Sequence, residues 1–422
     1  MNGEPLGLPD PPTDVPYPLA APADDYIAPI AAIRQIELDA GSAAIAGLPA
    51  APWHLTRIAP RSQTHAQVRY RHPGGLEVVG QWFADPSTYA RALHATRQTA
   101  SPPAQVVPLP QTRMFWQLGG ADRKLPGVAQ LCRIGATLVV HHPERRAVLR
   151  LATAAHYVKV LPSPQAAALA DRLQSVRAAL GDGGPRIPDL IHLDPTAGLV
   201  MMSALPGRSL LAWLSGETCA PPQLAALGCQ AGEAVARLHS GSLPSPTHHD
   251  AAALVTGLER GLQKTGWIAP ELSGYLAQWL PDIQTALLHA PAGPSVPLHR
   301  DCYDKQFIAA DGAMGLLDFD TLSAGEAELD VANFLVHCDL RAWQGRCAPQ
   351  RAATLATAFV QGYLQGDAPR PLSPDRLQAY ADATRLRLAC VYGCRPPQRA
   401  IVMRLVQSIG APLEWGVGPE KK

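Results

Sequence analysis

The chain has 422 residues, of which 47% are hydrophobic and 17% charged, enough apolar material for two or three packed domains. Its formal net charge is +1, and lysine and arginine are scattered along the sequence, so we expect no nucleic acid and no membrane among its partners. The eight cysteines lack paired C-x-x-C spacing, which favours reduced thiols over disulfides or a zinc site.

Residues 1–26 are rich in proline and acidic side chains and contain few large apolar groups. Such a segment cannot bury enough apolar surface to offset the entropy of ordering, so we predict a disordered, proline-rich tail. No lysine or arginine occurs before Arg34, and no apolar run approaches the length of a bilayer span. We therefore expect no secretory leader and predict a cytoplasmic protein.

Residues 27–118 predict a separate α+β domain, because short apolar runs there are divided by turn residues. The pattern is typical of strand, turn, strand and helix, with strands over 54–58, 67–70 and 76–83 and a helix from Pro86 onward. We expect this β-rich unit to form a cap-like domain ahead of the rest of the chain.

The same order of elements recurs farther along the sequence. The second set of predicted elements covers 137–141, 147–151, 157–161 and 164–180. The recurrence indicates a weak internal duplication, although short patterns of this kind also coincide by chance. Lys159 stands where the first copy has Gln81. Only the second copy therefore carries a side chain that could bind a phosphate.

Beyond Gly207 the pattern becomes helical, beginning with apolar residues at helical spacing from Leu224 to Leu238. Further helical patterns cover about 251–288, 328–340, 352–364 and 374–390. A β-rich small lobe over 119–204, followed by a helical large lobe over 205–422, predicts a bilobal enzyme with its cleft between the lobes.

Polar and charged residues interrupt the apolar pattern in the segment 298–330, which reads LHRDCYDKQFIAADGAMGLLDFDTLSAGEAELD. Two short apolar runs within it, Phe307–Ala310 and 314–317, are joined at Asp311-Gly312 and predict a β-hairpin. Such a hairpin would bring the loop that precedes it close to the acidic residues that follow it. The segment therefore predicts a cluster of oxygen ligands.

Three motifs stand in this segment, namely His299-Arg300-Asp301, Gln306, and Asp318-Phe319-Asp320. Their order and spacing, with the GEAELD sequence that follows, resemble the catalytic loop and metal-binding motif of the aminoglycoside phosphotransferase and choline-kinase-like family, relatives of the protein kinases. The resemblance implies an α+β, bilobal protein-kinase-like fold, here preceded by an additional β-rich N-terminal domain. It also implies a phosphotransferase that uses ATP and Mg²⁺ and acts on a small molecule.

The resemblance assigns a role to each motif residue, since phosphoryl transfer needs alignment and charge neutralisation more than covalent help. Asp301 would be catalytic, orienting the acceptor hydroxyl and accepting its proton. Asp318 would bind Mg²⁺, and Gln306, where the family more often has asparagine, would supply a neutral oxygen. Asp320 is either a further metal ligand or a hydrogen-bond partner of the catalytic loop. Taken singly, Asp301 and Asp318 could cap turns, and His299 is expected to brace the loop.

Lys159 lies in the strand-like run HYVKVLP and matches in order the family's lysine that contacts the α- and β-phosphates of ATP; a solvated strand lysine is the plainer alternative. The usual helix glutamate partner is missing, so either Asp171 replaces it or the ion pair is absent. The turn before this strand reads HHPERRA, not a glycine-rich loop. Arg145 or Arg146 could reach a phosphate there, although we expect exposed turn arginines.

Residues 199–210 resemble the family's hinge, a strand that leaves the small lobe and ends in a Pro-Gly turn. In the family the backbone of this segment binds the adenine edge, which assigns cofactor contacts to Met202, Ser203 and Ala204. The side chains of Met201 and Met202 could line the nucleotide site or simply belong to the core.

The chain is also similar in outline to sugar kinases of this superfamily that carry an N-terminal cap domain. Acceptor specificity is expected to depend on the helical lobe. The candidate residues there are Asp339, Trp343, Arg387, Tyr392 and Arg395. Residues 342–422 contain many arginines and few acids, which favours a sugar, amino sugar or related metabolite over a polycationic aminoglycoside. An aminoglycoside-type kinase and a non-catalytic, nucleotide-binding pseudokinase are the alternatives.

Overall fold

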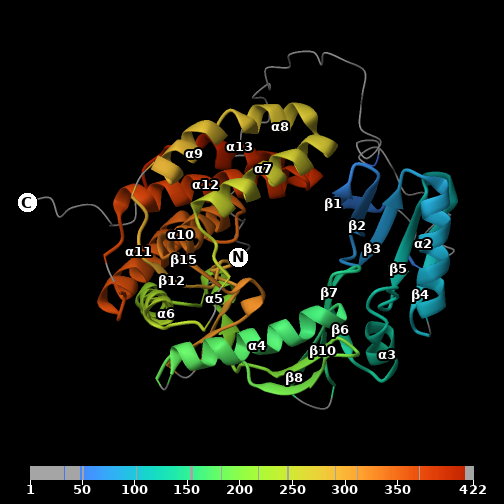
Figure 1. Ribbon diagram of the computed structural model, residues 1–422, viewed down its shortest axis with the longest axis horizontal. Coiled ribbons are helices and arrows are strands. Elements are labelled where there is room, and N and C mark those ends of the chain that lie inside the picture. The colour runs from blue at the N-terminus through green and yellow to red at the C-terminus, as the bar shows by residue number, and fades with distance from the viewer. Residues whose placement is uncertain are drawn as a thin grey trace, which may run out of the picture.

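The computed structural model shows two sheets and a large helical part (Figure 1). The described residues are 33, 48–49, 52–100, 102–152, 155–181, 183–216, 218–244, 247–289, 291–310, 312–369 and 371–413. The tail predicted over 1–26 and the turn residue Asp311 lie outside them. Within this part of the chain, no helix has the length and apolar character needed to cross a bilayer.

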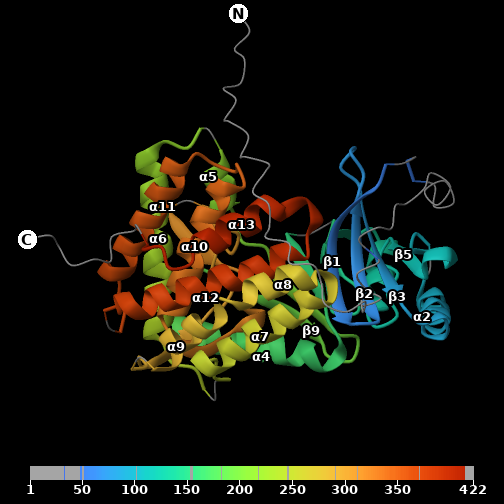
Figure 2. The ribbon, with the colours of Figure 1, turned by 90° about the horizontal axis from the view of Figure 1, so that it is seen from above.

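The N-terminal sheet has five antiparallel strands in the order β1-β2-β3-β5-β4. Its elements are β1 (His54–Ser62), β2 (His65–Arg71), β3 (Glu77–Phe83), α2 (Pro86–Thr99), β4 (Gln105–Leu109), η2 (Pro110–Thr112) and β5 (Met114–Leu118). Tyr70 and Trp116 are fully buried on one face. On the other face, α2 packs Tyr89 against Phe83 and Phe115, so α2 forms the outer layer of the molecule at this end (Figure 2).

The second sheet repeats this design with the strand order β6-β7-β8-β10-β9. It follows α3 (Gly127–Arg133) and consists of β6 (Thr137–His142), β7 (Arg146–Arg150), β8 (His156–Val160), α4 (Ser163–Leu180), β9 (Leu190–Asp194) and β10 (Leu199–Ser203). In both sheets a helix follows the third strand, and the fifth strand lies between the third and the fourth. The internal repeat expected from the sequence is confirmed at the level of topology.

The large helical part follows the second sheet and contains the main hydrophobic core. Its helices are α5 (Leu210–Ser215), α6 (Pro221–Ser240), α7 (Ala251–Ile268), α8 (Pro270–Ala277), α9 (Leu280–His289), α10 (Glu328–Trp343), α11 (Pro349–Gln365), α12 (Pro374–Gly393) and α13 (Arg399–Gln407), with the 3-10 turn η4 (Pro396–Gln398). The helical pattern expected over 251–288 comprises three helices. Pro270 and Pro281 explain the breaks, because proline fits the first turn of a helix but not its interior.

Short strands in the helical part carry the motif segment. They are β11 (Arg208–Ser209), β12 (Ser295–Leu298), β13 (Phe307–Ala310), β14 (Ala313–Leu316) and β15 (Ser323–Glu326), with the 3-10 turn η3 (Phe319–Thr321). The predicted hairpin is confirmed, since β13 pairs with β14 in antiparallel register. The fold as a whole is the predicted one, a β-rich lobe and a helical lobe preceded by an extra β-rich domain.

The N-terminal sheet contacts the helical part along β1, its innermost strand (Figures 1 and 2). Ile58 N donates a hydrogen bond to Cys394 O at 2.9 Å, and Ile268 at the end of α7 belongs to the core of this sheet. These contacts hold one wall of the N-terminal domain against the end of α12.

The N-terminal sheet also binds the turn between β6 and β7. Arg69 Nη2 donates to His141 O at 3.2 Å, and Arg61 Nη2 donates to Pro143 O at 3.3 Å. Gln67 Nε2 donates to the same Pro143 carbonyl. We call these three hydrogen bonds the turn contacts. They fix the backbone just before Arg145 and Arg146.

Candidate active site

The predicted catalytic loop lies between β12 and β13 and is braced by a buried histidine. His299 Nε2 bonds to Leu317 O at 2.7 Å, and its ring lies 5.0 Å from that of Phe319. His299 Nδ1 accepts a hydrogen bond from Asp301 N at 3.3 Å. The imidazole therefore joins the loop to the segment after β14, which is the bracing role expected for it.

Asp330, in the first turn of α10, holds the backbone of the same loop. Its carboxylate accepts hydrogen bonds from His299 N and Arg300 N, both at 2.7 Å. It also pairs with His239 Nε2 at 3.2 Å, and His239 Nδ1 bonds to the Tyr363 hydroxyl at 2.9 Å. Arg300 has a positive φ of 66°, so these bonds stabilise a backbone conformation that arginine rarely adopts alone.

The buried carboxylate of Asp330 is ionised. Burial raises its pKa, but the hydrogen bond from His239, the electrostatic interaction with the His239 and His299 side chains and the backbone hydrogen bond from His299 hold the pKa below its ordinary value. The sequence placed Asp330 only at the end of a motif and missed this role. Nothing in the local sequence indicates it, because its partners come from α6 and from the loop itself, and the α6 partner His239 is in turn held by Tyr363 of α11.

Asp301 points into a cavity and contacts Gln306, the residue at which the sequence departs from the family pattern. Gln306 Nε2 donates to Asp301 Oδ2 at 3.1 Å. Gln306 N bonds to Tyr303 O, and Gln306 O accepts from Leu317 N, both at 2.9 Å. The side chain is thus anchored at its backbone and lies beside the carboxylate proposed as the base.

Two carboxylates after β14 meet two cations of the second sheet. Lys159 Nζ lies 2.8 Å from Asp318 Oδ1 and 2.5 Å from Asp320 Oδ1. Arg146 Nη1 lies 2.6 Å from Asp320 Oδ2 and 3.6 Å from Asp318 Oδ2. Lys159 is buried and is therefore not a solvated strand lysine.

Asp318 is ionised in this cluster and has a positive φ of 66°. Burial raises its pKa, but the charges of Lys159 and Arg146 outweigh that effect and hold the pKa below its ordinary value. Asp171 is exposed on α4, and among the described residues the carboxylates that pair with Lys159 are those of Asp318 and Asp320. The helix ion pair is therefore absent, as one of the two sequence-based alternatives had it.

Arg146 corrects an expectation. An exposed turn arginine was favoured, yet Arg146 is half-buried and bound to Asp320, because β7 faces Asp318 and Asp320 across the cleft. Arg145 is exposed, as expected.

The donor set of this cluster fits a magnesium ion shared with a nucleotide. The described residues hold no group of three or more His, Cys, Asp and Glu side chains arranged to bind a metal by themselves. Asp318, Asp320 and the Gln306 amide oxygen offer oxygen ligands only. Mg²⁺ in kinases is typically bound by one or two carboxylates and by substrate phosphates, so a protein cage is not needed here.

The predicted hinge lies on β10 and just after it. Ser203 N donates to Asp189 O at 3.0 Å, and Ala204 N donates to Ala155 O at 2.7 Å. Met202 packs on the core of the helical lobe, and Met201 packs on that of the second sheet. None of the described residues of β10 lines the cavity around Asp301, so the structure does not bring these residues into the cluster described above.

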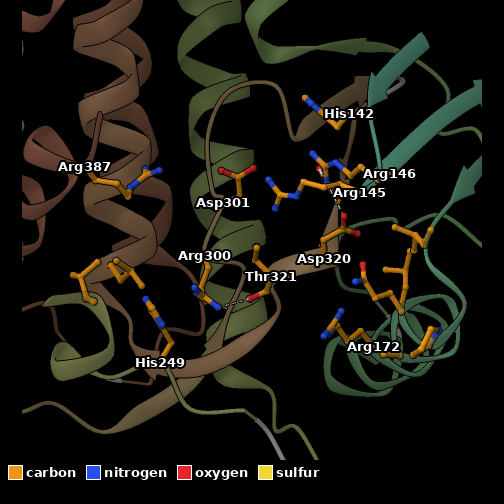
Figure 3. Close-up of a pocket in the computed structure, with 18 of the residues that line it drawn as sticks. His142, Arg145, Arg146, Arg172, His249, Arg300, Asp301, Asp320, Thr321 and Arg387 are labelled. Atoms are coloured by element: carbon orange, nitrogen blue, oxygen red, sulfur yellow. Dashed lines mark hydrogen bonds and ion pairs between the residues drawn. The ribbon is translucent and has the colours of Figure 1, made fainter. Parts of the chain in front are cut away.

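The cavity beside Asp301 has a volume of about 830 Å³ and is lined by the second sheet, α4, the catalytic loop, α12 and β1 (Figure 3). It contains Asp301, Asp318 and Asp320. Its basic lining residues are Arg57, His142, Arg145, Arg146, Arg172, His249, Arg300, Arg387 and Arg395. The lining of this cavity therefore carries more positive than negative charge.

Several of these lining residues were not singled out from the sequence. Arg57 comes from the N-terminal domain, Arg172 from α4, and His249 from the segment before α7. Of the five acceptor candidates, Arg387 and Arg395 line the cavity, whereas Asp339, Trp343 and Tyr392 are not among its lining residues. No sequence pattern links these arginines, because they are brought together only by the packing of distant elements.

Comparison with known protein families decides the class. The family model described as "Phosphotransferase enzyme family" matches residues 135–377, more than half of the chain. The chain belongs to the phosphotransferase enzyme family. The resemblance seen in its motifs is thereby confirmed, and the enzyme is a small-molecule phosphotransferase. The matched residues leave out β1 to β5.

Solved structures similar to this phosphotransferase include three kinases. A glucosamine kinase in complex with glucosamine, ADP and inorganic phosphate is 16% identical over 92% of this chain and 99% of its own, with a TM-score of 0.46. An amicoumacin kinase in complex with AMP-PNP is 13% identical over 67% and 91%, with a TM-score of 0.49. A choline/ethanolamine kinase family protein from Mesorhizobium loti is 16% identical over 69% and 92%, with a TM-score of 0.43. No curated protein matches the sequence.

Proposed function

We propose that this phosphotransferase moves the γ-phosphate of ATP, with Mg²⁺, to a hydroxyl group of a small molecule. The observation that carries the proposal is the convergence of Asp301 with the Lys159, Asp318 and Asp320 cluster around one cavity. One wall offers a base, and the other offers charges of both signs suited to phosphates and a cation. Phosphoryl transfer requires that pair of functions.

Each residue has a definite task in this proposal. Asp301 accepts the proton of the acceptor hydroxyl, and Gln306 holds its carboxylate in place through the 3.1 Å bond. Asp318, Gln306 and Asp320 offer oxygen ligands to Mg²⁺, which when bound neutralises the charge of the β- and γ-phosphates. Lys159 then exchanges part of its contact with the carboxylates for the phosphates. Met202, Ser203 and Ala204 are proposed to contact the adenine through their backbone.

The acceptor is proposed to be a sugar or a related metabolite. An aminoglycoside would bring several positive charges into a cavity lined by seven arginines and three aspartates, and like charges at close range repel. A pseudokinase would be expected to lack Lys159, Asp301 or Asp318, and all three are present. We also propose that the enzyme acts in the cytoplasm.

The test is Mg²⁺-dependent ADP release by purified protein, with a panel of sugars and small alcohols as acceptors. Replacement of the base, Asp301→Asn, is expected to lower kcat by about 10²-fold to 10⁴-fold, since the hydroxyl then keeps its proton. Asp171→Asn is the matched control, because it removes a carboxylate that is exposed on α4, and it should retain wild-type rates. Equal turnover by Asp301→Asn and wild type would disprove the mechanism. Nucleotide binding without turnover in the wild type would favour the pseudokinase alternative.

A further inference from the structure

The cavity beside Asp301 has a surplus of positive charge that the proposed nucleotide does not explain in full. Seven arginines line it against three aspartates. Arg146 is paired with Asp320 and Asp318. Within the described part of the chain, none of the six other arginines forms an ion pair with a carboxylate. Unpaired guanidinium groups gathered in one cavity favour an anionic ligand.

These arginines fall on two sides of the proposed base. Arg145 and Arg146 lie beside Asp320, where the phosphates of a nucleotide would be placed (Figure 3). Arg387, on α12, lies across Asp301 from them (Figure 3). A hydroxyl that is in contact with Asp301 would therefore place the rest of its molecule near Arg387.

Arg387 is held in a fixed position. Its Nη2 donates to Asn333 Oδ1 at 2.7 Å, and Asn333 Nδ2 donates to Cys302 O at 2.9 Å. The guanidinium is thus joined through one amide to the residue after Asp301. Burial lowers the pKa of Arg387, and the charge of Asp301 opposes that shift. A half-buried cation with one neutral hydrogen-bond partner is stabilised when an anion binds to its remaining donors.

Two more arginines of the same cavity lie where the end of α12 meets β1. The hydrogen bond from Ile58 N to Cys394 O, at 2.9 Å, brings Arg57 of β1 next to Arg395 at the end of α12. The guanidinium of Arg395 stacks on the Tyr392 ring at 4.5 Å. Burial and then the charge of Arg395 lower the pKa of Arg57 to about 10. The fold holds these two positive charges close together, so a bound anion would lower the electrostatic repulsion between them.

We propose that the acceptor carries an anionic group, a carboxylate or a phosphate ester, beside the hydroxyl that is phosphorylated, and that Arg387 binds this group while Arg395 and Arg57 add positive charge to the same cavity. The inference rests on the proposed function and names the substrate class of the same site. The planar guanidinium fork matches both kinds of anion in two-point contacts. In the transfer, the acceptor oxygen bonds to the γ-phosphorus, the bond from that phosphorus to the β–γ bridging oxygen breaks, ADP leaves, and the proton passes to Asp301.

The test uses four acceptors of similar size and different charge, namely glucose, glucosamine, glucuronate and glucose 6-phosphate. We expect one of the two anions to exceed glucose and glucosamine in kcat/KM by at least about tenfold, the effect of one charge-assisted contact. The two anionic arms distinguish a carboxylate from a phosphate ester. The same ranking is measured by thermal shift with Mg²⁺ and a non-hydrolysable ATP analogue. Absence of any preference for the anions in both measurements would overturn the inference.

Variants test the arginines themselves through the ratio of anionic to neutral acceptor within each protein. Arg387→Gln should lower this ratio by about 10-fold to 100-fold, and Arg387→Lys should restore part of it. Arg57→Gln is a second variant, in a different domain, for the case in which Arg387→Gln does not fold. Arg404→Gln removes the same charge from an exposed position on α13 and should leave the ratio unchanged.

The two proposals fail in different ways. If the proposed function is wrong, wild-type protein shows no Mg²⁺-dependent turnover of ATP with any acceptor or with water. If only this inference is wrong, wild-type protein turns over neutral or cationic acceptors as well as anionic ones. A ratio that is unchanged in both Arg387→Gln and Arg57→Gln would also overturn it.

Discussion

The two sheets share one topology. They differ at one position, where the first sheet has Gln81 and the second has Lys159, the residue proposed to contact phosphate. Gln81 on β3 is fully buried in a chain of neutral groups: it bonds to His65 at 2.9 Å and to Gln117 at 3.0 Å, and Gln117 bonds to Ala121 O at 2.7 Å. Lys159 on β8 is buried against two carboxylates instead. The same backbone arrangement therefore holds a neutral network in one copy and an ionic cluster in the other.

The difference between the two sheets follows from the partners that a buried charged group needs and a buried neutral group does not. A buried amide is satisfied by neutral partners at little cost, whereas a buried ammonium group needs carboxylates within contact distance. Only the second sheet faces such carboxylates, since the motif at Asp318 and Asp320 lies across the cleft from β8. The first sheet instead lines the cavity with Arg57 and, through the turn contacts, holds the backbone before Arg145 and Arg146 in place.

The largest effect is expected when the second sheet is given the residue of the first. Lys159→Gln should lower kcat/KM for ATP by about 10³-fold, because the site loses a positioned charge on the phosphates and leaves two carboxylates with Arg146 alone. Steady-state rates of ADP release measure this. Lys264→Gln removes an exposed lysine of α7 and should behave as wild type. If Lys159→Gln retains the wild-type kcat/KM, the proposed role of Lys159 in phosphate binding, which separates the second sheet from the first, is contradicted.

The reciprocal change tests the first sheet. Gln81→Lys should lower the free energy of unfolding by roughly 3 kcal/mol, because the new charge is buried among neutral partners. Burial lowers the pKa of such a lysine in the folded state, so the folded state binds fewer protons, and stability should recover as pH rises toward the unfolded pKa. Urea denaturation at pH 7 and pH 10 measures both effects. Gln81→Met separates the charge from the lost amide; equal stability of the two variants would contradict the charge argument.

A smaller effect is expected at the turn contacts. Gln67→Leu keeps the volume of the side chain but removes its donor to Pro143 O, so the backbone before Arg145 and Arg146 becomes less well fixed. KM for ATP should rise about fivefold, the effect of one hydrogen bond, with kcat little changed. Gln98→Leu on the outer helix α2 is the control. A rise in acceptor KM without a rise in ATP KM would place the function of these contacts elsewhere.

Much of the fold could be predicted, because its strongest signals are local. The hairpin at β13 and β14 and the stripe on α6 follow from short-range periodicity and turn residues, and the structure has both. Strands β4 and β5 were not predicted. β4 contains Pro108 and is tolerated because it is the edge strand of its sheet. The domain boundaries placed at 26, 118 and 204 stay predictions.

The residues of the candidate site also fall into two groups, those that local sequence reveals and those that only the folded chain brings together. The motif residues Asp301, Gln306 and Asp318 stand close together in the sequence and could be found there, although their roles remain proposals. The role of Asp330 and the contribution of Arg57 could not be found, since each depends on elements that meet only in the folded chain. Long-range contacts of this kind leave no trace in local spacing.

The turn contacts have a consequence for where the catalytic unit begins. The loop between β6 and β7, beside the proposed phosphate site, contains no glycine-rich run of amides. Its backbone is held from β1 and β2 through the carbonyls of His141 and Pro143. The smallest working enzyme should therefore start at β1 instead of β6. A domain that contains none of the proposed catalytic groups would then be as necessary to nucleotide binding as the loop that it supports.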